Sequence, residues 1–162
     1  MALPGTRGCM YTADGLEHSP SGTPSSLAAD HSAQLDKRAA KINGFDFGPD
    51  WGEVTGEGPS CLVCWGSATG PCREAAARLT RAGYPTRVVA LRLIAPLSGQ
   101  ALREALDGAE TILVVEQNHG AQLFGYLHAQ QALPRHARAF ARPGPLPLRP
   151  ADIAAAGRPT EA

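Results

Sequence analysis

The stretch that decides the fold covers residues 61–83 and reads CLVCWGSATGPCREAAARLTRAG. It opens with a short apolar run, residues 61–65, which is typical of a buried strand. A glycine-rich turn at residues 66–70 follows, and Pro71 stands where a first helical residue is expected. Apolar residues then recur at helical spacing until Gly83, which should end the helix. The stretch therefore predicts a strand, a tight turn and a helix.

The same alternation continues toward the C-terminus. We expect strands at residues 86–93, 110–116 and 138–141, and helices at residues 98–106, 120–133 and 150–156. The continuous apolar run of the third strand, ETILVVE, suits a parallel strand that is covered on both faces. This order predicts an α/β fold with helices on both faces of the sheet. In such sheets functional groups gather beyond the carboxyl ends of the strands.

Residues 1–58 differ in composition from the rest of the chain. They have few apolar runs and include a segment, GLEHSPSGTPSSLAA, that is rich in glycine, proline and serine. One helix is expected there at residues 30–42, with Asp30 as its N-cap. We therefore divide the chain into an irregular arm, residues 1–58, and an α/β domain, residues 59–162.

Composition narrows the class of protein. The 162 residues allow about one domain. The 15 basic and 15 acidic side chains cancel, which argues against nucleic acid as a partner. No stretch has the roughly 18 apolar residues of a membrane helix, and the N-terminus lacks the apolar core of a signal peptide. We expect a cytoplasmic protein without a membrane partner, whose four cysteines are reduced.

The turn at residues 66–70 is a candidate ligand site through Gly66, Ser67 and Gly70. Glycines allow close backbone approach, and a following helix offers free N–H groups to an anion. The turn lacks the sequence of a Walker A loop and of a dinucleotide fingerprint. A plain strand-to-helix turn remains the simpler interpretation. The alternative function is an independent α/β module that binds a small anionic ligand at this turn.

A second candidate loop follows the third strand and contains Glu116, Asn118 and Gln122. Glu116 or the neighbouring His119 could transfer protons, but the sequence shows no partner for them. We favour hydrogen bonds to neighbouring loops or a subunit contact, and assign no catalytic residue.

Cys61 and Cys64 form a CxxC pair, with Cys72 nearby, a spacing that suggests zinc or redox chemistry. Residues three apart on a strand point to opposite faces, however, so the two thiols cannot easily bind one metal ion. We expect buried thiols that pack as small apolar side chains, and no metal site.

A series of short motifs, read in order, resembles the α subunits of 2-oxoacid:ferredoxin oxidoreductases, particularly the 2-oxoglutarate type. The motifs are PGTRG (4–8), YTADGLEH (11–18), DKRAAK (36–41), WGSATGPCREA (65–75), LRLIAPL (91–97), VEQNHGAQL (115–123) and LPLRPADI (146–153). The sequence departs from the family pattern at three positions. Cys64 and Ala121 stand where the family has glycine, and Ser98 stands where a second proline is usual.

The resemblance implies a transketolase C-terminal-like domain, a three-layer α/β/α sandwich on a mostly parallel sheet with one antiparallel strand. It also implies a reaction, the oxidative decarboxylation of a 2-oxoacid with coenzyme A to acyl-CoA, CO2 and reduced ferredoxin. Thiamine diphosphate, Mg2+ and an iron–sulfur cluster serve such enzymes, and the resemblance places the thiamine diphosphate motif in the β subunit.

The resemblance further implies that this chain is the C-terminal portion of an α subunit whose pyrimidine-binding domain would precede residue 1. Such a portion binds no cofactor alone and is inactive alone. Its expected partners are the missing domain and a β subunit carrying thiamine diphosphate and the cluster, with ferredoxin and coenzyme A reached through the complex. In the arm, Glu17 and His18 would contact the missing domain. The two candidate loops would face a partner or the coenzyme A path.

Overall fold

The computed structural model describes residues 3–9 and 13–159. The chain forms two compact units, Met1–Asp46 and Phe47–Ala162. Among the described residues, no helix is long and apolar enough to cross a membrane.

The first unit consists of a short antiparallel strand pair and one helix. The strands are β1 (Glu17–His18) and β2 (Pro24–Ser25), and the helix is α1 (Ala28–Asn43). The expected helix is therefore confirmed, but Asp30 is not its N-cap. Leu27 takes that position without a side-chain hydrogen bond, and Asp30 lies in the first turn, where the helix dipole favours a negative charge. Within its own unit, α1 buries no side chain.

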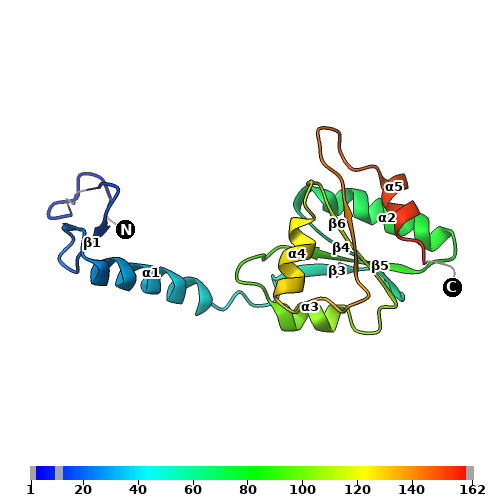
Figure 1. Cartoon of the computed structure of the whole chain (residues 1–162), viewed down its shortest axis with the longest axis horizontal. Coiled ribbons are helices and arrows are strands. Elements are labelled where there is room, and N and C mark those ends of the chain that lie inside the picture. Colours follow the sequence, from blue (N-terminus) through cyan, green and yellow to red (C-terminus); the bar gives the residue numbers. More distant parts are fainter. Residues whose placement is uncertain (1–2, 10–12, 160–162) are drawn as a thin grey trace. The chain divides into compact units, whose positions relative to one another are not determined.

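The second unit is a five-stranded sheet layered by helices (Figure 1). The strands, in the spatial order of the sheet, are β3 (Gly52–Thr55), β5 (Thr86–Leu91), β4 (Ser60–Trp65), β6 (Thr111–Glu116) and β7 (Arg138–Ala141). Only β3 is antiparallel to its neighbour, and the other pairs are parallel. The helices are the short 3-10 helix η1 (Gly66–Ala68), α2 (Thr69–Arg81), α3 (Gly99–Ala105), α4 (Gln122–Ala129) and α5 (Pro150–Ala156). The predicted fold class, including one antiparallel strand, is confirmed.

Each face of the sheet has its own apolar core. On one face, Leu62 and Leu113 pack with Leu79 of α2 and Ile153 of α5, and these two helices run side by side in Figure 1. On the other face, the strands pack against α3 and α4; this core includes Val63, Ile112, Val114, Leu102, Leu123 and Leu127. All six residues of β4 except Trp65 are buried, as the apolar run predicted. The central strands are thus covered on both sides.

The structure differs from the sequence-based boundary between residues 58 and 59. β3, which the sequence analysis left in the arm, pairs with β5 from Gly52↔Leu91 to Thr55↔Val88. β3 is an edge strand of four residues, and its only large apolar side chain, Val54, is 46% exposed. Its sequence therefore lacks the apolar run that identifies a buried strand. The helix after β4 also differs, because η1 follows the strand and α2 begins at Thr69, two residues before Pro71.

We predict that Gly58, which connects β3 to β4, tolerates no side chain. Its φ is +127°, and a Cβ atom there would lie 2.2 Å from the Pro85 carbonyl oxygen. Gly58→Ala should lower the free energy of unfolding by at least about 2 kcal/mol in urea titration. Gly125→Ala is the control, because a Cβ atom on this exposed α4 residue meets nothing within 4 Å. It should raise stability by about 0.5–1 kcal/mol. Equal stability of the two variants would contradict the prediction.

Candidate functional site

The two candidate loops follow neighbouring parallel strands and therefore lie at one edge of the sheet. Trp65 ends β4 and Glu116 ends β6, and the two strands pair in parallel. The sequence analysis placed both loops beyond carboxyl ends of strands, and the topology agrees. This is the edge at which parallel α/β sheets present functional groups.

Glu116 is the centre of the second loop. Its side chain is buried, with 1% exposure, at the last position of β6. The carboxylate accepts hydrogen bonds from the backbone N–H groups of Leu123 at 2.6 Å and Phe124 at 3.0 Å. These groups belong to the first turn of α4, whose N–H groups have no partner inside the helix. Glu116 therefore ties the end of the strand to the start of the helix.

Asn118 completes this arrangement. Its side-chain amide donates to the Glu116 carboxylate at 2.5 Å, and its Oδ1 accepts from the backbone N–H of Gln122 at 3.4 Å. Glu116 and Asn118 thus hold the loop by hydrogen bonds, which is the role that the sequence analysis favoured. The exposed side chain of His119 makes no hydrogen bond within the described ranges, so no proton relay connects it to Glu116.

Gln122 differs from its two neighbours. It is the first residue of α4, is exposed, and its side-chain amide has no hydrogen-bonding partner in the described part of the chain. The backbone just before it is strained, because Ala121 has the left-handed values φ 48° and ψ 49°. The loop therefore presents one unpaired amide at the edge of the sheet.

The first loop combines an exposed ring with a glycine turn. Trp65 is 49% exposed, and Gly66 has a φ of +56°, which favours glycine. Ser67 is exposed, and its hydroxyl has no partner among residues 3–9 and 13–159. Gly70 is exposed as well, and a Cβ atom there would meet nothing within 4 Å. The turn leaves open space around its backbone.

The sequence analysis missed a charged cluster near this edge. Glu53 of β3 accepts from Arg73 of α2 at 2.6 Å and from Arg92, just after β5, at 2.9 Å. All three side chains are partly exposed. In the sequence, the strand that carries Glu53 could be recognised only by alternating polar and apolar residues. Four residues are too few for such a pattern to identify a strand.

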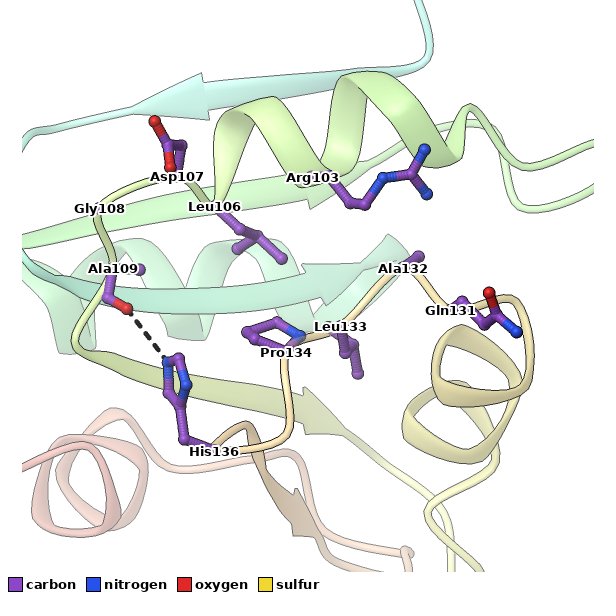
Figure 2. A pocket seen from close by; sticks show the side chains of 10 residues that line it. All are labelled: Arg103, Leu106, Asp107, Gly108, Ala109, Gln131, Ala132, Leu133, Pro134 and His136. Carbon is purple, nitrogen blue, oxygen red and sulfur yellow. Dashed lines mark hydrogen bonds between the residues drawn. The ribbon is translucent and has the colours of Figure 1, made fainter.

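A pocket of about 350 Å³ lies at the opposite, amino edge of the sheet (Figure 2). It is enclosed by the segments that precede β6 and β7, and Leu106 and Leu133 supply apolar surface. The His136 ring nitrogen Nε2 lies 3.1 Å from the Ala109 carbonyl oxygen. None of the predicted site residues lines this pocket, and no pattern in the sequence indicated it.

The three cysteines of the predicted group separate as expected. Cys61 belongs to the core against α3 and α4, whereas Cys64 and Cys72 belong to the core against α2 and α5. Burial raises the pKa of Cys61 to about 11. Within the described ranges, no three His, Cys, Asp or Glu side chains gather where they could hold a metal ion.

The arm residues Glu17 and His18 interact inside the first unit. The Glu17 carboxylate accepts from both terminal nitrogens of Arg38, one of them at 2.9 Å, and this hydrogen bonding lowers the pKa of Glu17. The His18 carbonyl accepts from the side-chain amide of Gln34 at 3.1 Å. Their predicted contact with a preceding domain stays a prediction.

Comparison with known sequences identifies relatives of this chain. Residues 52–125 match the model of the transketolase C-terminal domain. The chain is 31% identical over 124 residues to 2-oxoacid:ferredoxin oxidoreductase 2 subunit alpha of Aeropyrum pernix, covering 74% of this chain and 19% of the relative. It is 34% identical over 122 residues to the 2-oxoglutarate oxidoreductase subunit KorA of Mycobacterium tuberculosis, and this match covers 74% of this chain and 18% of the relative.

Solved structures agree with these relatives. A structure of 2-oxoglutarate:ferredoxin oxidoreductase from Magnetococcus marinus, with 2-oxoglutarate, coenzyme A and succinyl-CoA bound, superposes with a TM-score of 0.73 and 27% identity, covering 96% of this chain and 27% of that one. A split-gene transketolase, an inactive β4 tetramer, shares the fold with a TM-score of 0.54 and 19% identity, covering 70% of this chain and 43% of that one.

Residues 52–125 of the second unit thus match the transketolase C-terminal domain, and the unit has the fold of that domain. The chain is similar to subunits of 2-oxoacid:ferredoxin oxidoreductases, which confirms the resemblance of its motifs. It spans about a fifth of the length of the curated relatives that it matches. These relatives give no support to the alternative of an independent anion-binding module.

We predict that the hydrogen bonds accepted by the buried Glu116 carboxylate hold the second loop. Glu116→Gln should lower the free energy of unfolding by about 2–3 kcal/mol, because an amide group replaces one acceptor oxygen in front of buried N–H donors. Glu110→Gln, at an exposed position just before β6, should change stability by less than about 0.5 kcal/mol. Chemical denaturation of both variants tests this, and a small effect at Glu116 would refute it.

A second prediction concerns Ala121, where a substitution should increase the stability of the protein rather than decrease it. Ala121→Gly should raise the free energy of unfolding by about 1 kcal/mol, because glycine adopts the left-handed backbone of this position without strain. The matched variant Ala129→Gly, in the last turn of α4, should lower it by about 0.5 kcal/mol. If thermal or urea unfolding gave both variants the same sign, Ala121 would not be strained.

Proposed function

We propose that this chain is the C-terminal structural and subunit-contact part of a 2-oxoacid:ferredoxin oxidoreductase α subunit, with 2-oxoglutarate as the substrate of the assembled enzyme. The observation that carries the proposal is the superposition of 96% of the chain on an enzyme of this activity. Two curated relatives are α-type subunits of the same class, which supports the same assignment. The assembled enzyme would convert the 2-oxoacid and coenzyme A to acyl-CoA and CO2, and reduce ferredoxin.

The cofactors of this reaction belong, in our proposal, to partner chains. The described residues contain no cluster of three metal-ligating side chains, which does not fit a site for Mg2+ or an iron–sulfur cluster here. We therefore assign thiamine diphosphate, Mg2+ and the cluster to a β subunit. When bound there, they would supply carbanion stabilisation and electron transfer. The chain described here would be inactive alone.

In the assembled enzyme, the residues of this chain would hold the two candidate loops in place and contact coenzyme A or a partner subunit. Glu116 and Asn118 hold the loop through buried and half-buried hydrogen bonds that tie it to the start of α4. Gln122 and Ser67 are exposed polar side chains on loops at the carboxyl edge of the sheet, and both are free of partners in the described part of the chain. We propose that Gly66, Ser67, Gly70 and Gln122 face coenzyme A or a partner subunit.

The first unit, which contains most of the arm, would contribute to the assembly of the α subunit. Glu17 is fixed by Arg38, and His18 by Gln34, so the strand pair and α1 form one ordered element. The apolar side chains Leu35 and Ile42 of α1 are 47% and 51% exposed. We propose that this unit packs against the pyrimidine-binding domain of the α subunit.

Reconstitution tests the proposed function. The chain is produced alone, and together with the remaining part of the α subunit and a β subunit, and ferredoxin reduction that depends on 2-oxoglutarate and coenzyme A is measured. We expect activity only in the complete assembly. Full activity of the assembly without this chain, or no stable association with the other parts, would overturn the proposal.

Gln122 allows a narrower test in the assembled enzyme. Gln122→Ala should raise the KM for coenzyme A roughly 2- to 10-fold, the effect of one lost hydrogen bond, with little change for the 2-oxoacid. Gln130→Ala is the control, because this exposed glutamine lies at the other end of α4. Unchanged kinetics of the Gln122 variant would remove this residue from the coenzyme A path while leaving the subunit assignment intact.

A further inference from the structure

The pocket at the amino edge of the sheet opens onto the apolar core of the second unit (Figure 2). Four of the residues that line it, Leu106, Ala109, Ala132 and Leu133, are buried and belong to the core between the sheet and the helices α3 and α4. Its volume of about 350 Å³ is that of a small-molecule site, a range that begins near ~300 Å³. The pocket therefore offers apolar surface to a ligand of small size.

Polar side chains stand at the two ends of this apolar surface. In Figure 2, His136 lies at one end beside Ala109, and Arg103 lies at the other end, on the side of Gln131. The His136 ring is held by Nε2, which donates to the Ala109 carbonyl oxygen at 3.1 Å, because a carbonyl oxygen can only accept. The carboxylate of Asp107, the one acidic group among the lining residues, points away from the leucine side chains in this view.

Arg103 brings a positive charge to the pocket that no acidic side chain of the described residues balances. The ion pairs of the described chain involve other arginines, and the Arg103 guanidinium makes no hydrogen bond with residues 3–9 or 13–159. This side chain lies close to α3, since a Cβ atom on Gly99 would lie 3.3 Å from its Nη1 atom. A guanidinium group binds a carboxylate through two parallel hydrogen bonds. This end of the pocket therefore favours an anionic group.

A second arginine is bonded to one of the lining residues. Arg87 extends from β5, and one of its terminal nitrogens donates to the Asp107 carbonyl oxygen at 2.6 Å. Its Nε is buried and has no hydrogen-bonding partner in the described part of the chain. Buried polar groups in native proteins nearly always have a partner, so this atom indicates that a further polar group belongs near this corner. The positive charge of Arg87 adds to the attraction for an anion.

We propose that this pocket binds a small carboxylic acid with an apolar body, in its ionised form. The carboxylate would pair with Arg103, and the body would cover the apolar lining toward the His136 ring. A cationic ligand would be repelled by Arg103 and Arg87, and a neutral one would leave Arg103 unpaired. Inorganic phosphate would lose its hydration without covering the apolar lining. The proposal does not rest on the proposed function, because neither Gln122 nor the turn at residues 66–70 lines this pocket.

Binding of 3-phenylpropionate to the full chain tests the proposal. This probe joins a carboxylate to an aromatic body, and NMR measures its dissociation constant from the backbone amide shifts of the isotope-labelled chain. We expect saturable binding with a dissociation constant of about 1–10 mM. The largest shifts should fall on the lining residues Gly108, Ala109, Ala132 and Leu133. Shifts without saturation, or largest shifts at Gln122 or residues 66–70, would overturn the proposal.

Two further probes separate the parts of the ligand. 3-Phenylpropionamide has the same body without the negative charge, and it should bind about 10-fold more weakly than 3-phenylpropionate. Inorganic phosphate has the charge without the body, and it should leave the amide shift of Leu133 unchanged at the concentrations that saturate 3-phenylpropionate. Equal affinity of the amide, or phosphate bound as tightly as 3-phenylpropionate, would overturn the proposed class of ligand.

A pair of variants tests the direct contact with Arg103. Arg103→Gln should weaken the binding of 3-phenylpropionate about 10-fold, whereas Arg135→Gln should change it by less than about 2-fold. Arg135 is an exposed arginine next to the lining residue Pro134 but does not line the pocket. Both substitutions remove one positive charge, so the comparison separates contact from long-range attraction. Equal dissociation constants for the two variants would refute the contact. If the Arg103 variant fails to fold, the charged and neutral probes decide on the unaltered chain.

Discussion

A single buried carboxylate, that of Glu116, holds the end of β6 to the start of α4. Glu116 ends β6 inside the protein, where its buried carboxylate accepts hydrogen bonds from the backbone N–H groups of Leu123 and Phe124 and from the side-chain amide of Asn118. Removing the carboxylate or one of these donors leaves the remaining buried polar groups without a hydrogen bond. Such a loss is costly because the protein interior is of low polarity. The position of the exposed Gln122 follows from this buried arrangement.

The sequence predicted those parts of the fold that depend on local pattern. Long apolar runs identified β4, β5 and β6, and the ordered motifs indicated the family. β3 escaped because an edge strand of four residues is stabilised by pairing with β5, far along the chain, rather than by its own composition. The loop around Glu116 was found as a polar cluster after a strand, but its hydrogen-bond donors are backbone groups, which residue types do not reveal.

The departures from the family pattern are informative about local structure. Ala121, where the family has glycine, occupies a left-handed backbone conformation that glycine adopts without strain. Cys64, also in place of a glycine, is fully buried in the core between the sheet and α2. Sequence spacing drew attention to Cys61 and Cys64, but these two thiols belong to the cores on opposite faces of the sheet.

The helix α1 has a consequence for the lifetime of the chain in a cell. Its unit supplies no core of its own, since none of the α1 side chains is buried within it, and Leu35 and Ile42 present apolar surface. Chaperones and proteases act on chains that expose such surface or open easily. A copy outside the proposed assembly would thus be open to proteolysis at this unit, whereas packing in that assembly would cover the same surface. Under that proposal, the supply of the other subunits would set the abundance of this chain.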